Sequence, residues 1–294
     1  MHAKALIDAL AEPGAGERVR ELDRSGRLTA WLPELEAGRG FAQPELHAYD
    51  VFEHSLAALE AADAVLGPGS AGTAFRDALG WVDFERWLGR MVYGVPLPAL
   101  VKLGALLHDL GKPATATVVE GRLRFPRHGP VGAELAEPRL AALGFSEAAA
   151  AFVARLIRFH LRPAELVRNW PLTDRAVRRF VRDLDGEVLA LMVVNLADGW
   201  ATQGPRYTRE HFRRHCTFAN AVLARAWAAT EPGEHEAPLV TGDDLIAELG
   251  LSGGRLLGAV LTSVRDAQIE GRVRTRSEAL ELARSVLTSL GAAE

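Results

Sequence analysis

The chain has 294 residues, of which 48% are hydrophobic and 24% charged, as expected for a globular protein with a substantial core. Its net charge of −4 excludes a general attraction to nucleic acid, so any such attraction must be local. The single cysteine, Cys216, excludes an internal disulfide, and no signal-peptide core or membrane-spanning apolar run is found, so we expect a soluble cytoplasmic protein.

Residues 1–49 are predicted to form a helical neck. Apolar spacing favours short helices in its first part, and the Gly and Pro content of residues 38–49 indicates a loop. Asp50 then suits the N-cap of a helix, and Glu53 completes a capping-box pattern. This places His54 in the first turn of that helix.

Residues 75–93 are expected to form one or two short amphipathic helices with three aromatic residues in the core, namely Trp81, Phe84 and Trp87. Residues 97–107 then form a nearly continuous apolar run that only Lys102 interrupts. Because Pro98 suits the first turn of a helix, this run predicts a helix buried on all sides.

The end of that buried helix carries His108 and Asp109 side by side. Gly111 is predicted to be the left-handed residue that closes the helix, and Pro113 to prevent its continuation. Two ligands for one ion converge more easily at a helix end than in mid-helix, where neighbouring residues point about 100° apart. The alternative is a helix-end histidine beside an aspartate that accepts backbone hydrogen bonds.

The middle of the chain is predicted to contain several helices that carry single polar residues at their ends or on their apolar faces. Residues 117–125 predict one β-hairpin, and His128 precedes a helix over 130–143. His160 continues the apolar face of a helix capped by Ser146, and Asp198 ends the apolar face of a helix over 187–200. A carboxylate at such a place is expected to have a buried partner.

A polar linker at residues 231–238 predicts a domain boundary. It separates a domain over 50–230 from a C-terminal domain over 239–294, for which we expect three helices, near residues 242–249, 254–268 and 276–290. The fold class predicted for the whole chain is all-α, a helical bundle with one small β-hairpin and a small helical tail domain.

Six residues from five elements form a candidate ligand set: His54, His108, Asp109, His128, His160 and Asp198. Four imidazoles and two carboxylates suit borderline divalent metals such as Mn, Fe, Ni or Zn, and the lack of thiolates disfavours a structural zinc site. A shared ion requires that His54 and Asp198 lie within roughly ten ångströms of His108 in the fold.

The pattern His54 … His108-Asp109 … Asp198 resembles the H…HD…D signature of the HD superfamily of metal-dependent phosphohydrolases. Further segments resemble the post-catalytic part of bacterial tRNA nucleotidyltransferases and poly(A) polymerases; they lie at residues 32–36, 50–55, 108–115, 172–180, 196–199, 241–246 and 267–271. The family's nucleotidyltransferase head, with its Gly-rich turn and paired Asp-x-Asp, is not found in the sequence. We therefore expect that this chain does not add CCA unaided.

The resemblance implies an HD-domain helical bundle that binds one or two divalent ions (Mn, Fe, Ni, Mg or Zn). His54, His108, Asp109 and Asp198 would hold the first ion, and His128 and His160 would complete a second one bridged by Asp109. The reaction implied is hydrolysis of a phosphate mono- or diester of a nucleotide or RNA end.

Four cations near these positions are candidate substrate ligands. Lys112 would be a catalytic or phosphate-binding residue, or else a surface cation at a helix end. Arg127, Arg158 and Arg162 would bind phosphate, or else be solvated or ion-paired.

The competing prediction is a non-catalytic RNA-binding module, with tRNA as the partner, or an accessory subunit of a tRNA nucleotidyltransferase. It depends on eight arginines within residues 155–182 and on Arg272, Arg274 and Arg276. The alternative explanation is that amphipathic helices in an arginine-rich chain must place arginine outside. The complete ligand set favours the enzyme.

Overall fold

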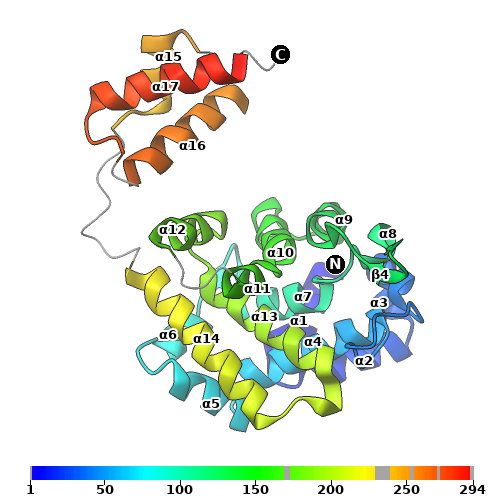
Figure 1. The fold of residues 1–294 in the computed structure, drawn as a ribbon. Coiled ribbons are helices and arrows are strands. Elements are labelled where there is room, and N and C mark those ends of the chain that lie inside the picture. Colours follow the sequence, from blue (N-terminus) through cyan, green and yellow to red (C-terminus); the bar gives the residue numbers. More distant parts are fainter. Residues whose placement is uncertain (1, 169–172, 229–238, 252–254, 270–271, 292–294) are drawn as a thin grey trace. The chain divides into compact units, whose positions relative to one another are not determined.

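The computed structural model describes all residues except 1, 169–172, 229–238, 252–254, 270–271 and 292–294. The chain divides into two compact units (Figure 1). One consists of Met1–Leu172 and Arg179–Ala226, and the other of Thr173–Arg178 and Trp227–Glu294. The predicted linker at 231–238 lies outside the described residues, so the domain boundaries stay a prediction. Among the described residues, no helix is both long and apolar enough to cross a membrane.

The first unit is built around four helices that pack against one another: α4 (Val51–Leu66), α7 (Leu97–Leu107), α10 (Glu147–Phe159) and α13 (Val188–Gln203). Ten of the eleven residues of α7 are buried, Lys102 among them. This confirms the predicted central helix. Lys102 is accommodated because its Nζ lies 2.8 Å from Asp63 of α4 and donates to the Glu12 carbonyl at 3.0 Å.

The remaining helices of this unit surround that core (Figure 1). They are α1 (His2–Ala11), α2 (Ala15–Arg24), α3 (Arg27–Trp31), the 3₁₀ helix η1 (Pro33–Gly38), α5 (Ser70–Ala78), α6 (Phe84–Leu88), α8 (Lys112–Thr115), α9 (His128–Leu143), α11 (Arg162–Arg168), η2 (Gly204–Arg206) and all but the last two residues of α14 (Arg209–Ala228). The helix α12 (Asp174–Asp183) is divided between the two units. The caps expected at Asp50 and Ser146 are present, because Asp50 accepts from the Glu53 N–H and Ser146 from the Ala149 N–H. The all-α prediction is therefore confirmed.

Two small antiparallel hairpins are present where one was expected. The predicted one pairs β3 (Thr117–Val119) with β4 (Arg122–Arg124). The other pairs β1 (Met91–Val92) with β2 (Val95–Pro96), at the end of the segment for which helices were expected. Strands of two residues are too short to show an alternating pattern, and the turn carries only one glycine, Gly94.

Trp81 was expected in the core, and that prediction is wrong. The side chain is 43% exposed, whereas Phe84 and Trp87 are buried as expected. Trp81 lies in the turn between α5 and α6, where no helical face directs it inward, and its indole N–H donates to Asn220 at 2.7 Å.

The second unit contains α15 (Gly242–Leu249), α16 (Arg255–Ile269) and α17 (Arg276–Gly291), close to the bounds expected. Their buried side chains include Leu245, Val260, Val264 and Ala283. A capping box starts α15, since Thr241 accepts from the Asp244 N–H while Asp244 accepts from the Thr241 N–H.

Candidate metal centre

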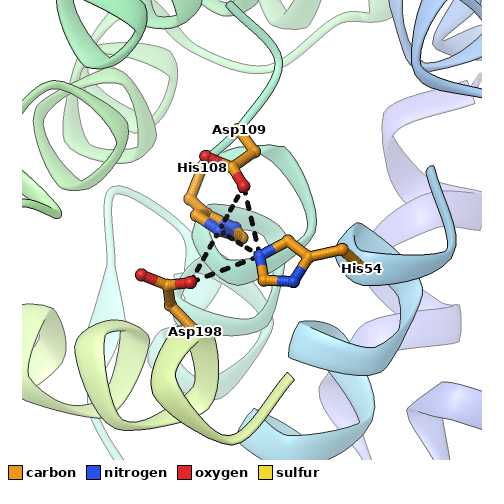
Figure 2. A group of neighbouring side chains, drawn as sticks. All are labelled: His54, His108, Asp109 and Asp198. Carbon is orange, nitrogen blue, oxygen red and sulfur yellow. Dashed lines mark hydrogen bonds and ion pairs between the residues drawn. The ribbon is translucent and has the colours of Figure 1, made fainter. Parts of the chain in front are cut away.

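Three helices of the first unit bring His54, His108, Asp109 and Asp198 together (Figure 2). His54 comes from the first turn of α4, His108 and Asp109 follow the end of α7, and Asp198 projects from α13. The ligand atoms of these four residues all lie within 4.8 Å of one another. His54 and Asp198 therefore lie within roughly ten ångströms of His108, as a shared ion requires.

The short distances in this group converge on a single point. His54 Nε2 lies 3.0 Å from His108 Nε2, 3.1 Å from Asp109 Oδ2 and 3.2 Å from Asp198 Oδ1. His108 Nε2 lies 3.2 Å from Asp109 Oδ2 and 3.5 Å from Asp198 Oδ1. Two nitrogens and two carboxylate oxygens thus face a common centre, as in a site for one small cation.

A second group uses the other oxygen of Asp109. Asp109 Oδ1 lies 3.3 Å from His128 Nε2 and 3.8 Å from His160 Nε2, and the two imidazole nitrogens are 3.1 Å apart. His128 begins α9, and His160 directly follows α10. Asp109 therefore has one oxygen in each group, which is the geometry of a bridging carboxylate.

Backbone carbonyls set the orientation of three of these imidazoles. His108 Nδ1 lies 2.7 Å from the Ala105 carbonyl, His128 Nδ1 2.7 Å from the Phe125 carbonyl and His160 Nδ1 2.7 Å from the Ile157 carbonyl. A carbonyl can only accept, so in each ring Nδ1 carries the proton and donates it. In a neutral ring, Nε2 is then left with a lone pair, as metal ligation requires.

The donor set fits a divalent ion. Two Nε2 lone pairs 3.1 Å apart, in His128 and His160, repel each other unless a proton or metal lies between or beside them. Asp109 Oδ2 is buried, and no described group donates a well-aligned hydrogen bond to it. A cation at the common centre would satisfy Asp109 Oδ2, and a second cation beside Asp109 Oδ1 would satisfy the two imidazole nitrogens.

Burial and neighbouring charges shift the pKa values of three groups in this centre. Burial lowers the pKa of His108, but Asp109 and Asp198 outweigh it and raise that pKa to about 10. Burial and the charge of His108 lower the pKa of His160 to about 3. The pKa of Asp109 lies well below its usual range because His108 and Lys112 outweigh its burial. A proton on His108 thus supplies the positive charge that a metal ion would otherwise provide.

Lys112 is not the surface cation that one alternative predicts, because it is only 5% exposed. Its Nζ lies 2.5 Å from Asp109 Oδ2 and donates to Gln43 Oε1 at 2.6 Å. His47 Nε2 is 3.5 Å from the same nitrogen, and burial together with the Lys112 charge lowers the pKa of His47 to about 4. A neutral His47 therefore offers Lys112 a second acceptor.

Sequence reasoning missed Gln43 and His47. Both lie in the loop before α4, whose Gly and Pro content indicated only irregular structure. They meet Lys112 across 69 and 65 positions of the chain, so no local pattern could have identified them.

The three arginines predicted as phosphate ligands differ in their surroundings. Arg127 is exposed and half-buried Arg158 lies on α10. Arg162 is ion-paired with Asp183 at 3.4 Å and lies 3.7 Å from Glu165. Phosphate binding by these residues stays a prediction, and for Arg162 a phosphate would compete with these two carboxylates.

Gly111 does not take the left-handed conformation predicted for it, since its φ is −81°. A glycine is required there for space. A Cβ on Gly111 would lie 2.2 Å from the His128 carbonyl oxygen and 2.6 Å from the Gly132 nitrogen. This close approach holds the start of α9, and with it His128, against the segment that carries Asp109.

Comparison with known proteins agrees with this geometry. Residues 85–199 match the HD domain family, a segment that contains all the candidate ligands except His54. The chain is 32% identical over 279 residues to the CC-adding tRNA nucleotidyltransferase of Thermus thermophilus, covering 93% of this chain and 54% of the relative. It is also 32% identical over 275 residues to the A-adding tRNA nucleotidyltransferase of Deinococcus radiodurans, covering 92% and 54%.

A third relative shares a shorter segment. The bifunctional uridylyltransferase/uridylyl-removing enzyme of Ruegeria pomeroyi is 27% identical over 192 residues, which cover 61% of this chain and 18% of that enzyme. The chain spans about half the length of the two tRNA nucleotidyltransferases. It contains an HD domain, and it resembles the C-terminal part of these tRNA nucleotidyltransferases.

Proposed function

We propose that this protein is a metal-dependent phosphohydrolase of the HD type, which hydrolyses a phosphate mono- or diester of a nucleotide or an RNA end. The observation that carries the proposal is the position of Asp109. It has one oxygen toward His54 and His108 and the other toward His128 and His160. A scaffold with no reaction to catalyse would not need two adjoining sets of ligand atoms around one buried carboxylate.

His54, His108, Asp109 and Asp198 would hold a first divalent ion, and Asp109, His128 and His160 a second. An ion bound there would lower the pKa of a water molecule and neutralise charge on the phosphoryl group. The Thr202 hydroxyl donates to Asp198 Oδ1 at 3.2 Å and so orients that carboxylate. Lys112 keeps Asp109 ionised, and its charge also attracts a substrate phosphate.

The test is hydrolysis by the purified chain after chelation and reloading with Mn²⁺, measured with bis-p-nitrophenyl phosphate and a 2′,3′-cyclic nucleotide. Asp109→Asn should abolish turnover and lower the bound metal. Asp8→Asn is the matched control, because it makes the same chemical change at a carboxylate that is 61% exposed. Turnover that survives in Asp109→Asn would refute the proposal.

A second candidate function, tRNA binding without catalysis, is favoured by the two tRNA nucleotidyltransferase relatives. Several of the arginines that would support it lie close to carboxylates of the same chain. Arg155 pairs with Asp185 and Arg179 lies near Asp183, while Arg276 pairs with Asp244. The side chains of Arg168 and Arg175 lie outside the described residues. Salt-sensitive tRNA binding with no turnover under any metal would favour this function.

A further inference from the structure

A cavity of about 470 Å³ lies in the first unit between α5 and the start of α14. None of the six candidate metal ligands lines it. Its volume falls within the range of about 300–1,000 Å³ that small-molecule sites occupy. One wall, on α5, is formed by small side chains such as Ala71 and Ala74, which leave room for a flat ligand.

Another part of the lining is aromatic, and contacts between its rings hold it in place. The Trp200 and Tyr207 rings stack with centroids 5.3 Å apart and an interplanar angle of 15°, and Phe212 meets Trp200 edge-on at 5.9 Å. The Tyr207 hydroxyl and His215 Nδ1 form a hydrogen bond of 2.8 Å, which fixes the orientation of the tyrosine ring. A rigid aromatic surface of this kind binds a planar ring at a low entropic cost.

The same cavity carries positive charge. Arg209 and Arg213, one helical turn apart on α14, both line it. Residues 206–214 contain four arginines and one glutamate in a chain with a net charge of −4. Arg213 lies 3.6 Å from Glu210, but both side chains are well exposed, at 74% and 65%, so this pair holds the guanidinium weakly. Arg209 makes no ion pair with any residue that the structure describes.

We propose that this cavity binds a nucleobase that carries a phosphate, either as a free nucleotide or as part of an RNA strand. The base would lie against the Trp200–Tyr207 wall, and its phosphate would be bound by Arg209 and Arg213. A ligand with a planar aromatic ring and a negative charge beside it would complement an aromatic wall that has two guanidinium groups at its edge. The inference does not depend on hydrolysis at the metal centre.

The experiment measures binding in EDTA and in the Asp109→Asn background, so that the metal centre contributes nothing. The probes are AMP and adenosine by calorimetry and a fluorescein-labelled oligoadenylate by anisotropy. Ala74→Trp fills the cavity from an exposed position on α5, and Arg213→Gln removes one guanidinium. Arg214→Gln is the matched control, since Arg214 is also exposed on α14 but does not line the cavity.

Ala74→Trp should weaken binding by about tenfold or more, as expected for loss of one base-stacking site. Arg213→Gln should weaken it several-fold and reduce its salt dependence, while Arg214→Gln should change it by less than about twofold. Binding of AMP but not of the oligoadenylate would identify a free nucleotide as the ligand. Binding of the oligoadenylate but not of AMP would identify RNA.

Three results would overturn the proposal. One is no binding of either probe by a folded chain. Another is adenosine bound as tightly as AMP, with Arg213→Gln without effect. The third is light scattering that shows a dimer disrupted by Ala74→Trp, in which case a second copy of the chain is the occupant. None of these results bears on phosphate-ester hydrolysis, which is assayed separately.

Discussion

Replacing Gly111 by alanine should weaken both the fold and the second group of ligands. Its backbone angles suit any residue, so the cost comes only from the added methyl group. That methyl would lie 2.2 Å from the His128 carbonyl oxygen and 2.6 Å from the Gly132 nitrogen. Both distances are about 1 Å short of van der Waals contact, and both partners are backbone atoms that no rotamer change can move aside.

The start of α9 must therefore move away from the Asp109 segment. Overpacking of this kind costs about 1–3 kcal/mol, and in a domain of this size each kcal/mol lowers Tm by about 2–4 °C. A shift of α9 also lengthens the distance from His128 Nε2 to Asp109 Oδ1, now 3.3 Å. Metal sites tolerate only about 0.2 Å of error in their ligand distances, so the occupancy of this group should fall.

Thermal unfolding followed by circular dichroism measures the first effect, and metal content after dialysis measures the second. Gly80→Ala is the control, because a Cβ there meets only the Asp77 carbonyl at 3.6 Å. If Gly111→Ala melted and bound metal like Gly80→Ala, the close approach of α8 and α9 would not hold the centre together.

Three further predictions concern separate parts of the chain. His128→Ala should reduce metal content from two equivalents per chain to one, as measured by elemental analysis; an unchanged content would argue against a bridging Asp109. Lys102→Met should lower the free energy of unfolding by about 3 kcal/mol in urea, because it leaves the Asp63 carboxylate without its buried partner. A loss below about 1 kcal/mol would mean that water solvates Asp63 instead. Burial raises the pKa of Cys216 to about 11, so about one native thiol in a thousand is ionised at pH 8. Cys216 should therefore resist iodoacetamide at pH 8 until the chain unfolds, and rapid labelling of the native protein, detected by mass spectrometry, would contradict this.

Local patterns in the sequence were enough to predict the helices and the kinds of residue at their ends. Apolar periodicity predicted α7 and α13 to within a few residues, and polar side chains on these apolar elements identified His108, Asp109 and Asp198 as candidates. Both signals are local, because hydrophobic spacing and end-capping act within a few turns. The same dependence on local signals explains why Trp81 was wrongly placed in the core and why the β1–β2 hairpin was missed, since short turns carry too few residues to show a period.

Which candidate residues meet, and what surrounds them, depends on how distant segments pack in the folded chain. His54 and Asp198 are far apart in the chain, yet each contacts His108 because α4, α7 and α13 pack side by side. The same packing brought Gln43 to Lys112 and made Gly111 necessary for space rather than for a left-handed turn. Packing between distant segments depends on the whole set of buried faces at once, and no single stretch of sequence contains that information.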